Sequence, residues 1–285
     1  MKLTQRLAIG YIQTKFKLLR LISKRMTAEQ AFKLFSTPWH RSKTKARLQH
    51  AEPLNFILDE IIIKGYRWNH PPAGPCGQVK KALILHGFGS AAHKFAEYVK
   101  PLTEKGYEVL AFDAPAHGSS SGKTTNAVEY SRMIKKVTEV FGPVNSFIAH
   151  SFGGIALSLA LEEMEHDAGT KIVFIAPATE TTSAVDSAFK MLKLNDKKIR
   201  SEFDNIIFEI SGKKTEWFSI RRAMHNIKAS VLWIHDEEDE VTPWADAEKV
   251  KEDNHPHINF VLTKGLGHQK IYRDNAIKNK AIEFM

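Results

Sequence analysis

The chain has 285 residues, enough for one large α/β domain or two small ones and for a core that needs no covalent cross-links. Its single cysteine, Cys76, rules out an intrachain disulfide and a cysteine-based metal site, which suits a reducing compartment. No stretch is long and apolar enough to cross a bilayer, and no signal peptide is apparent, so we expect a cytoplasmic protein.

The net charge of +9 is concentrated at the N-terminus. Residues 1–50 hold twelve Lys or Arg and one acid, Glu29, a charge of +11 that leaves the rest of the chain at −2. We therefore separate a basic helical segment, 1–50, from a main domain, 51–285. No nucleic-acid-binding motif accompanies the basic residues, so nucleic acid is not an expected partner.

The first predicted helix spans residues 3–25, and Lys and Arg cover much of its surface. Its apolar face carries Leu7, Tyr11, Leu18 and Ile22. A helix of this kind can lie in a membrane interface, which would make the protein weakly peripheral to a membrane through residues 1–25. Alternatively, the apolar face docks on the main domain or its cap, and we favour this second interpretation.

A second helix is predicted to begin with a capping box at Thr27 and Gln30. Beyond it, the apolar pattern of residues 56–68 predicts two antiparallel strands around Lys64–Gly65. A loop rich in Pro and Gly follows at 71–77.

The remaining elements alternate between strand and helix, which predicts an α/β fold with a mostly parallel, doubly wound sheet. The predicted strands are 81–86, 107–112, 147–149, 171–175, 231–235 and 258–262. The predicted helices are 95–105, 126–141, 155–161, 183–193, 196–211 with Asn195 as N-cap, and 274–284. The stretch 178–226 breaks the alternation after the strand at 171–175, which is the sixth when the two hairpin strands are counted, and we expect it to form a helical cap over the carboxyl ends of the strands.

The corner between strand and helix at Ser151 has the pattern of a nucleophile elbow. Such a corner holds the serine in a strained backbone conformation, with its hydroxyl clear of the sheet. The residues two positions either side must be small because strand and helix nearly touch, and here they are Ala149 and Gly153. The usual pattern has Gly where Ala149 stands. A turn of small residues without a catalytic role is the structural alternative.

In a parallel sheet, catalytic groups gather at the carboxyl ends of the strands. The strand at 81–86 ends in a Gly-rich turn, and glycines let backbone N–H groups face a cavity. The N–H groups of Phe88 and Phe152 would then form an oxyanion hole, unless the turn is only a connection to the next helix. Asp113 and His117 follow the next strand, and we interpret both as structural.

A histidine base and an acid that orients it are expected after the last two strands. His268 lies just beyond the carboxyl end of the final strand and is the predicted base. Four carboxylates follow the preceding strand, namely those of Asp236, Glu237, Glu238 and Asp239. Asp239 is favoured because the turn that follows it would aim it inward, and Glu180 is a second candidate for this role.

Five motifs in this order resemble those of the α/β-hydrolase superfamily over about residues 55–285. The matching residues are His86-Gly87-Phe88-Gly89, Asp113-x-Pro115-x-His117-Gly118-x-Ser120, His150-Ser151-Phe152-Gly153-Gly154, Asp239-x-Val241-x-Pro243 and Gly267-His268. The resemblance implies the α/β-hydrolase fold with a helical cap, and the same two oxyanion donors. It also implies a nucleophile at Ser151, a base at His268 and an orienting acid at Asp239.

The expected activity is that of a serine hydrolase, such as a carboxylesterase, lipase or thioesterase, which acts on a small-molecule ester or acyl compound. It would use a Ser-His-Asp triad and an acyl-enzyme, without a cofactor or a metal. The serine argues against the dehalogenase and epoxide-hydrolase branches, which use Asp at this position. Two alternatives stay open: an acyltransferase or carbon–carbon hydrolase with the same triad, and an inactive hydrolase-like binding protein.

Overall fold

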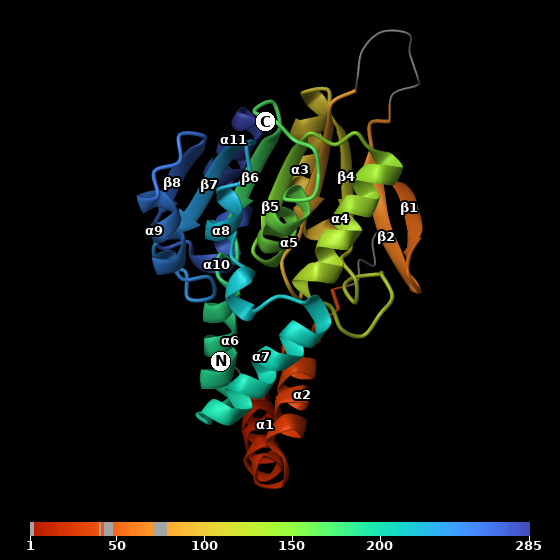
Figure 1. Ribbon diagram of the computed structural model, residues 1–285. Helices are drawn as coiled ribbons and strands as arrows, with labels where there is room; N and C mark the ends of the chain where they lie inside the picture. The colour runs from red at the N-terminus through yellow and green to blue at the C-terminus, as the bar shows by residue number, and fades with distance from the viewer. Residues whose placement is uncertain (1–2, 40, 43–47, 71–78) are drawn as a thin grey trace. The chain divides into compact units, whose positions relative to one another are not determined.

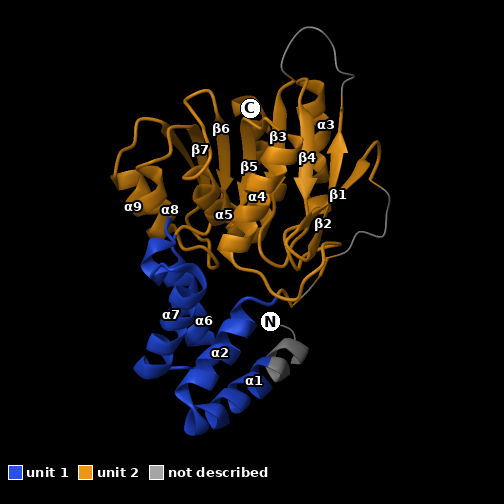
Figure 2. Ribbon diagram, turned by 45° about the vertical axis from the view of Figure 1, so that its right-hand side comes forward, with its two compact units in different colours: residues 1–37, 180–219 blue, residues 38–179, 220–285 orange. Residues whose placement is uncertain are grey.

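The computed structural model describes residues 3–39, 41–42, 48–70 and 79–285 (Figure 1). Cys76 and the predicted loop at 71–77 lie outside these residues. Within the described part of the chain, none of the helices has the length and hydropathy needed to span a membrane. The chain forms two compact units (Figure 2). The smaller contains Met1–Thr37 and Glu180–Ser219, and the larger contains Pro38–Thr179 and Ile220–Met285.

The larger unit is built on an eight-stranded sheet, which confirms the predicted α/β fold (Figure 1). Its strands are β1 (Glu52–Leu58), β2 (Ile61–Trp68), β3 (Lys81–Leu85), β4 (Glu108–Phe112), β5 (Ser146–His150), β6 (Lys171–Ile175), β7 (Ser230–Asp236) and β8 (Ile258–Thr263). They lie in the order β1-β2-β4-β3-β5-β6-β7-β8. The pairs β1–β2 and β2–β4 are antiparallel and the other pairs are parallel, so the parallel strands end at a common edge.

Helices cover both faces of this sheet (Figure 1). They are η1 (Ala92–Phe95), α3 (Ala96–Glu104), α4 (Ala127–Phe141), α5 (Phe152–Leu161), α8 (Ile220–Met224), α9 (Trp244–Glu252), α10 (Gly267–Lys270), η3 (Ile271–Arg273) and α11 (Asn275–Phe284). Side chains of α3 and α11 share a buried core with Ile84 and Ile148 of the sheet. Since neighbouring strand residues point to opposite faces, Leu83 and Phe147 face the other layer, where α4 packs against α5.

The first hairpin differs from the prediction, because the turn around Lys64–Gly65 is wrong. The strands β1 and β2 are joined at Asp59 and Glu60, where Asp59 has a left-handed φ of 53°. Gly65 lies inside β2, paired with Phe112 of the neighbouring strand. A Cβ atom on Gly65 would lie 2.2 Å from Cδ1 of Phe112, so this glycine makes room for an aromatic ring instead of forming a turn.

The smaller unit combines two helices from the N-terminus with the helices inserted between β6 and β7. They are α1 (Leu3–Ile22), α2 (Lys24–Phe35), α6 (Thr181–Leu192), α7 (Lys197–Ser211) and η2 (Thr215–Trp217). The ring of Phe203 on α7 contacts Phe32 and Phe35 of α2 and Phe189 of α6, at centroid distances of 5.2 to 5.8 Å. Phe16 of α1 is buried as well. The N-terminal helices and the insertion therefore share one core, while its role as a cap stays a prediction.

Two helix starts in this unit were predicted wrongly. The helix α2 begins at Lys24, because the Ser23 hydroxyl caps it by accepting from the Met26 N–H at 3.2 Å. Thr27, the predicted cap, lies inside the helix and donates its hydroxyl to the Ser23 carbonyl. The N-cap of α7 is Asp196 and not Asn195, since the Asp196 carboxylate accepts from the N–H groups of the first turn. Both residues that cap these helices, Ser23 and Asp196, adopt the extended backbone that a cap requires.

Candidate active site

The corner at Ser151 has the geometry of the predicted elbow. Ser151 joins β5 to α5 with φ 54° and ψ −119°, a strained conformation for a residue with a side chain. A Cβ atom on Gly153 would lie 2.8 Å from the Leu85 carbonyl oxygen, so strand and helix come as close as expected. Ala149, in place of the usual glycine, is fully buried and does not prevent this backbone conformation.

The structure brings together Ser151, His268 and Asp239, which the sequence analysis had selected from three separate strand ends. The Ser151 hydroxyl donates to Nε2 of His268, with 2.9 Å between Oγ and Nε2. Nδ1 of His268 donates to Oδ2 of Asp239 at 2.8 Å. Because an ionised carboxylate can only accept, the proton of the neutral imidazole lies on Nδ1, and Nε2 is free to accept a proton from the serine.

Asp239 is held as an anion by several donors. Its Oδ1 accepts from the N–H groups of Val241 and Thr242, at 2.8 and 2.9 Å. Its Oδ2 also lies 2.9 Å from the Thr242 hydroxyl. Burial raises the pKa of Asp239, but the hydrogen bond from His268 and the backbone donors outweigh burial, so that its pKa lies below the usual value. Thr242 was missed by sequence reasoning, although its place three residues after Asp239 is the available signal.

The other candidate acids have different partners. Asp236 accepts from the Thr263 hydroxyl at 2.7 Å and from the Leu266 N–H at 3.0 Å, so it shapes the loop that precedes His268. Glu180 belongs to the smaller unit, where it accepts from the Ser219 hydroxyl at 2.7 Å. Among the predicted acids, Asp239 is the one whose carboxylate contacts His268.

The Gly-rich turn after β3 approaches the elbow closely. A Cβ atom on Gly87 would lie 2.9 Å from Cβ of Ser151, so only glycine fits at this point. The rings of Phe88 and Phe152 meet edge to face at 5.5 Å. Phe152 is the first residue of α5, and N–H groups in the first helical turn have no acceptor within the helix. The two N–H groups predicted as oxyanion donors therefore belong to adjacent residues in space.

Asp113 and His117 hold this turn in place, which agrees with their interpretation as structural. The Asp113 carboxylate accepts from the N–H groups of Ala92 and Ser119, both at 2.8 Å. Nε2 of His117 accepts from the Gly89 N–H at 2.9 Å. Each side chain therefore connects the segment after β4, where it lies, to a backbone N–H group of the segment after β3.

His150, which sequence reasoning did not select, packs directly against His268. Their ring centroids are 4.8 Å apart, and Nε2 of His150 donates to the backbone carbonyl of His268 at 3.2 Å. Tyr272 covers His150 at a centroid distance of 4.6 Å. The position of His150, next to Ser151 in the chain, is the signal that would have found it. It helps to orient the loop that carries His268.

Acid is expected to destabilise the folded protein through three buried neutral histidines. These are His86, His117 and His150. Burial lowers their pKa values to about 4, 3 and 3. The pKa of a histidine in an unfolded chain is about 6.5. The contribution of each buried histidine to the free energy of unfolding is therefore complete above that pH, and it is lost as the pH falls toward the pKa in the folded protein. The expected loss is up to about 1.4 kcal/mol per pH unit and group.

Denaturant titrations between pH 7 and pH 5 measure this effect as a fall in the free energy of unfolding. The variant His117→Gln should show a shallower fall, whereas His50→Asn, at an exposed histidine, should match the wild type. A free energy of unfolding that stays constant over this range would contradict the prediction.

Comparisons with known proteins indicate an α/β-fold hydrolase. Residues 78–219 match the model of the family described as serine aminopeptidase, S33. A putative chloroplastic methylesterase 15 from Arabidopsis thaliana is 27% identical over 147 residues, which cover 48% of this chain and 30% of that protein. The chain therefore matches less than a third of the length of this relative.

Solved structures of esterases share the fold at low sequence identity. The esterase Pf2001 from Pyrococcus furiosus is 17% identical with a TM-score of 0.62, covering 87% of this chain and 95% of its own. The esterase Est2 from Thermogutta terrifontis is 16% identical with a TM-score of 0.60, covering 86% and 92%. Mouse alpha/beta hydrolase domain-containing protein 10 is 16% identical with a TM-score of 0.57, covering 81% and 96%.

Proposed function

Since the chain belongs to the α/β-hydrolase superfamily, we propose that it is a serine hydrolase that cleaves a carboxylic ester or a related acyl bond. The observation that carries the proposal is the pair of hydrogen bonds made by His268, from the Ser151 hydroxyl and to the Asp239 carboxylate. A serine hydroxyl is a poor nucleophile until a neighbouring base takes its proton. This geometry supports a triad in which each group has one role.

In the first half of the reaction, Nε2 of His268 takes the proton of Ser151 as Oγ attacks the carbonyl carbon. The lowered pKa of Asp239 keeps its carboxylate ionised at neutral pH, and its charge stabilises the imidazolium that forms. The N–H groups of Phe88 and Phe152 stabilise the oxyanion of the tetrahedral intermediate. His268 then returns its proton to the leaving oxygen, the ester C–O bond breaks, and an acyl-enzyme remains.

In the second half, His268 takes a proton from water, which attacks the acyl-enzyme. The tetrahedral intermediate collapses, Ser151 recovers its proton from His268, and the carboxylic acid leaves. An acyltransferase would differ only in the acceptor, because an alcohol, amine or thiol would replace the water.

Labelling with a fluorophosphonate probe tests the proposal, because the probe reacts only with an activated serine. We expect one label per chain, located on Ser151 by mass spectrometry of the digested protein. Chromogenic esters of increasing acyl chain length would then give the substrate range. An unlabelled protein without esterase activity would instead support the inactive binding protein, and label on another serine would exclude the proposed nucleophile.

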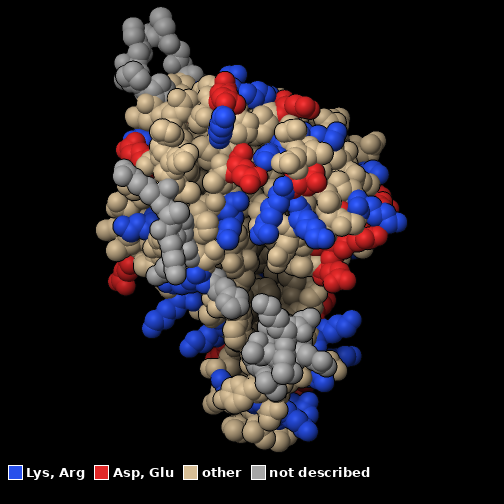
Figure 3. All heavy atoms as spheres, turned by 180° about the vertical axis from the view of Figure 1, so that it is seen from behind, with Lys and Arg blue, Asp and Glu red and all other residues tan. Residues whose placement is uncertain are grey.

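We also propose that the smaller unit makes a weak contact with anionic membranes through α1. The helix has two apolar faces, of which one buries Phe16. Its exposed apolar residues are Tyr11 (74%), Leu18 (61%), Leu21 (77%) and Ile22 (74%). Lys15 and Lys17 are exposed beside them, and Figure 3 shows Lys and Arg side chains beside uncharged surface in the lower part of the molecule. Apolar side chains bordered by lysines suit an anionic lipid surface.

Vesicle co-sedimentation at low salt measures this contact. The double variant Leu18→Gln and Ile22→Gln is expected to bind vesicles containing phosphatidylserine at least about tenfold more weakly than the wild type, because each change removes an insertable apolar side chain. Binding of the wild type should also fall as salt rises. Ile57→Gln, at an apolar residue equally exposed on β1, is the matched control. Full-length protein that ignores anionic vesicles at low salt would contradict the contact.

A further inference from the structure

Three side chains with metal-binding atoms lie together in the larger unit, away from the proposed triad. They are His225, Asp253 and His255, and one ligand atom from each lies within 4.8 Å of the others. His225 follows α8 and precedes β7, while Asp253 and His255 lie between α9 and β8. This cluster is therefore at the amino ends of two parallel strands. The triad is at the carboxyl ends, so the cluster takes no part in the proposed hydrolysis.

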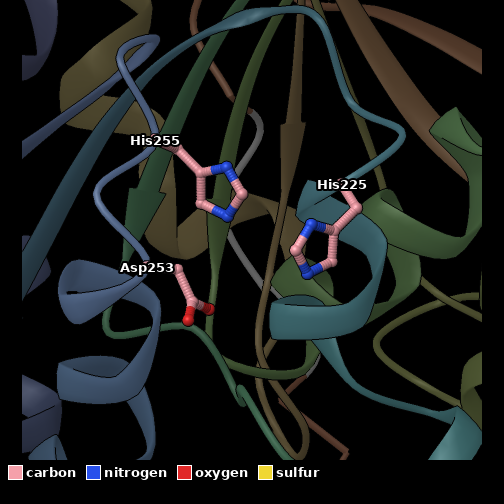
Figure 4. Close-up of side chains that lie close together, drawn as sticks. All are labelled: His225, Asp253 and His255. Carbon is pink, nitrogen blue, oxygen red and sulfur yellow. The ribbon is translucent and has the colours of Figure 1, made fainter.

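The three side chains converge on a common space. In Figure 4 the two imidazole rings face each other across a gap, and the Asp253 carboxylate lies beside it. The ring centroids of His225 and His255 are 5.2 Å apart. Nitrogen and oxygen ligands of a tetrahedral zinc ion lie about 3.4 Å from one another. The ligand atoms here lie within 4.8 Å of one another, so the three groups need to close by only a small movement. The His225 side chain is exposed and can rotate to make it.

His255 gives the independent sign of a missing partner. Its Nε2 atom is shielded from solvent and has no hydrogen-bond partner among the described residues. A buried polar atom without a partner is costly, and a bound ion is one kind of partner that satisfies such an atom. Nε2 is also the nitrogen that most often binds a metal in proteins. A cation between the rings would satisfy this atom.

Arg221 contacts the Asp253 carboxylate and therefore affects how this cluster could bind a metal. Its guanidinium donates to both oxygens of Asp253, each at 2.7 Å. A carboxylate oxygen has two lone pairs, so it can accept from arginine and bind a metal at once, and metal-binding carboxylates are commonly held in this way. Because Arg221 offsets the charge of Asp253, the affinity must come mainly from the imidazoles. Imidazole nitrogen favours zinc, nickel or copper over magnesium or calcium.

We propose that His225, Asp253 and His255 bind a divalent transition-metal ion, such as Zn²⁺, with water completing the coordination. The ion would join the end of α8 to the turn between α9 and β8. Its effect is structural, because it connects two segments that are about 30 positions apart in the chain. No cysteine takes part. The single cysteine of the chain rules out a cysteine-based metal site, but it does not rule out this one.

Calorimetric titration of the metal-stripped, full-length protein with ZnCl₂ tests the site. We expect one ion per chain and a rise in the melting temperature when zinc is added. His225→Ala and His255→Ala should each weaken zinc binding at least about tenfold, since each removes one ligand. His50→Asn, at an exposed histidine elsewhere on the larger unit, should bind zinc as the wild type does. MgCl₂ should produce no comparable heat.

The result that overturns the proposal is zinc binding that both alanine variants retain at full strength, or no binding at millimolar zinc. Circular dichroism of the metal-free variants separates a lost ligand from a lost fold, because a folded variant that fails to bind zinc supports the site. Cobalt adds a second readout. A tetrahedral Co²⁺ complex with histidine and carboxylate ligands absorbs visible light strongly, and this band should vanish in His255→Ala.

Discussion

Replacing Ser151 by alanine is expected to lower ester turnover by roughly 10⁴ to 10⁶ while the protein stays folded. The hydroxyl that this change removes is the one that donates to Nε2 of His268 at 2.9 Å. Without it, the base has no nucleophile to activate. Alanine keeps the Cβ atom, so the strained backbone at this corner changes little. The measurement is kcat on a chromogenic ester, with the melting temperature as a check on folding.

Ser158→Ala is the matched control for this experiment. Ser158 is a fully buried serine of α5, the helix that follows Ser151, and its hydroxyl donates to backbone carbonyls of the preceding turn. Its loss should leave turnover within a few-fold of the wild type. If Ser151→Ala kept more than about a tenth of the activity, Ser151 would not be the nucleophile.

Replacing Asp239 by asparagine should cost roughly 10⁴ in turnover, although the side chain keeps its shape. An amide can donate to Nδ1 of His268, which the carboxylate cannot do. The imidazole proton would then move to Nε2, the atom that must accept the proton of Ser151. The loss should appear in kcat, with the fold preserved.

Asp236→Asn and Glu238→Gln are the comparisons that identify the acid. Asp236 contacts Thr263 and Leu266, and Glu238 is exposed, so neither change alters the partner of Nδ1. Each should cost much less than Asp239→Asn, with the larger effect at Asp236 because it supports the loop before His268. The reverse ranking would move the acid away from Asp239.

Much of the larger unit could be predicted from local patterns in the sequence. Short apolar runs such as 81–86 and 171–175 predict buried strands because a strand buried on both faces needs apolar side chains throughout. The elbow at Ser151 was recognisable because only small residues fit where strand and helix touch. Ser151, Asp239 and His268 were recognisable because each lies soon after a predicted strand, in the chain order that this fold requires. These features depend on residues close together in the sequence.

Other features were decided by contacts between distant parts of the chain. The turn that follows Asp239 favoured it among the four carboxylates, but its contact with His268 depends on where the loop before His268 comes to lie, and no local pattern contains that position. The buried face of α1 was also decided by tertiary contacts. The sequence pattern identified an apolar face with Tyr11 and Leu18, but these residues are exposed, and Phe16 is buried instead.

The first hairpin and the histidine cluster also show the difference between local sequence patterns and tertiary contacts. Glycine is typical of turns, and for that reason Gly65 was assigned to one. It lacks a side chain instead because the ring of Phe112, on another strand, fills the space that a Cβ atom would need. His225 and His255 are 30 residues apart and meet only when α8, α9 and β8 are in place. The sequence by itself determined the elements and the types of residue at their ends, because periodicity and backbone preferences act over a few neighbouring residues. Which side chains meet was decided by the tertiary structure, because burial is shared among segments that the chain keeps far apart.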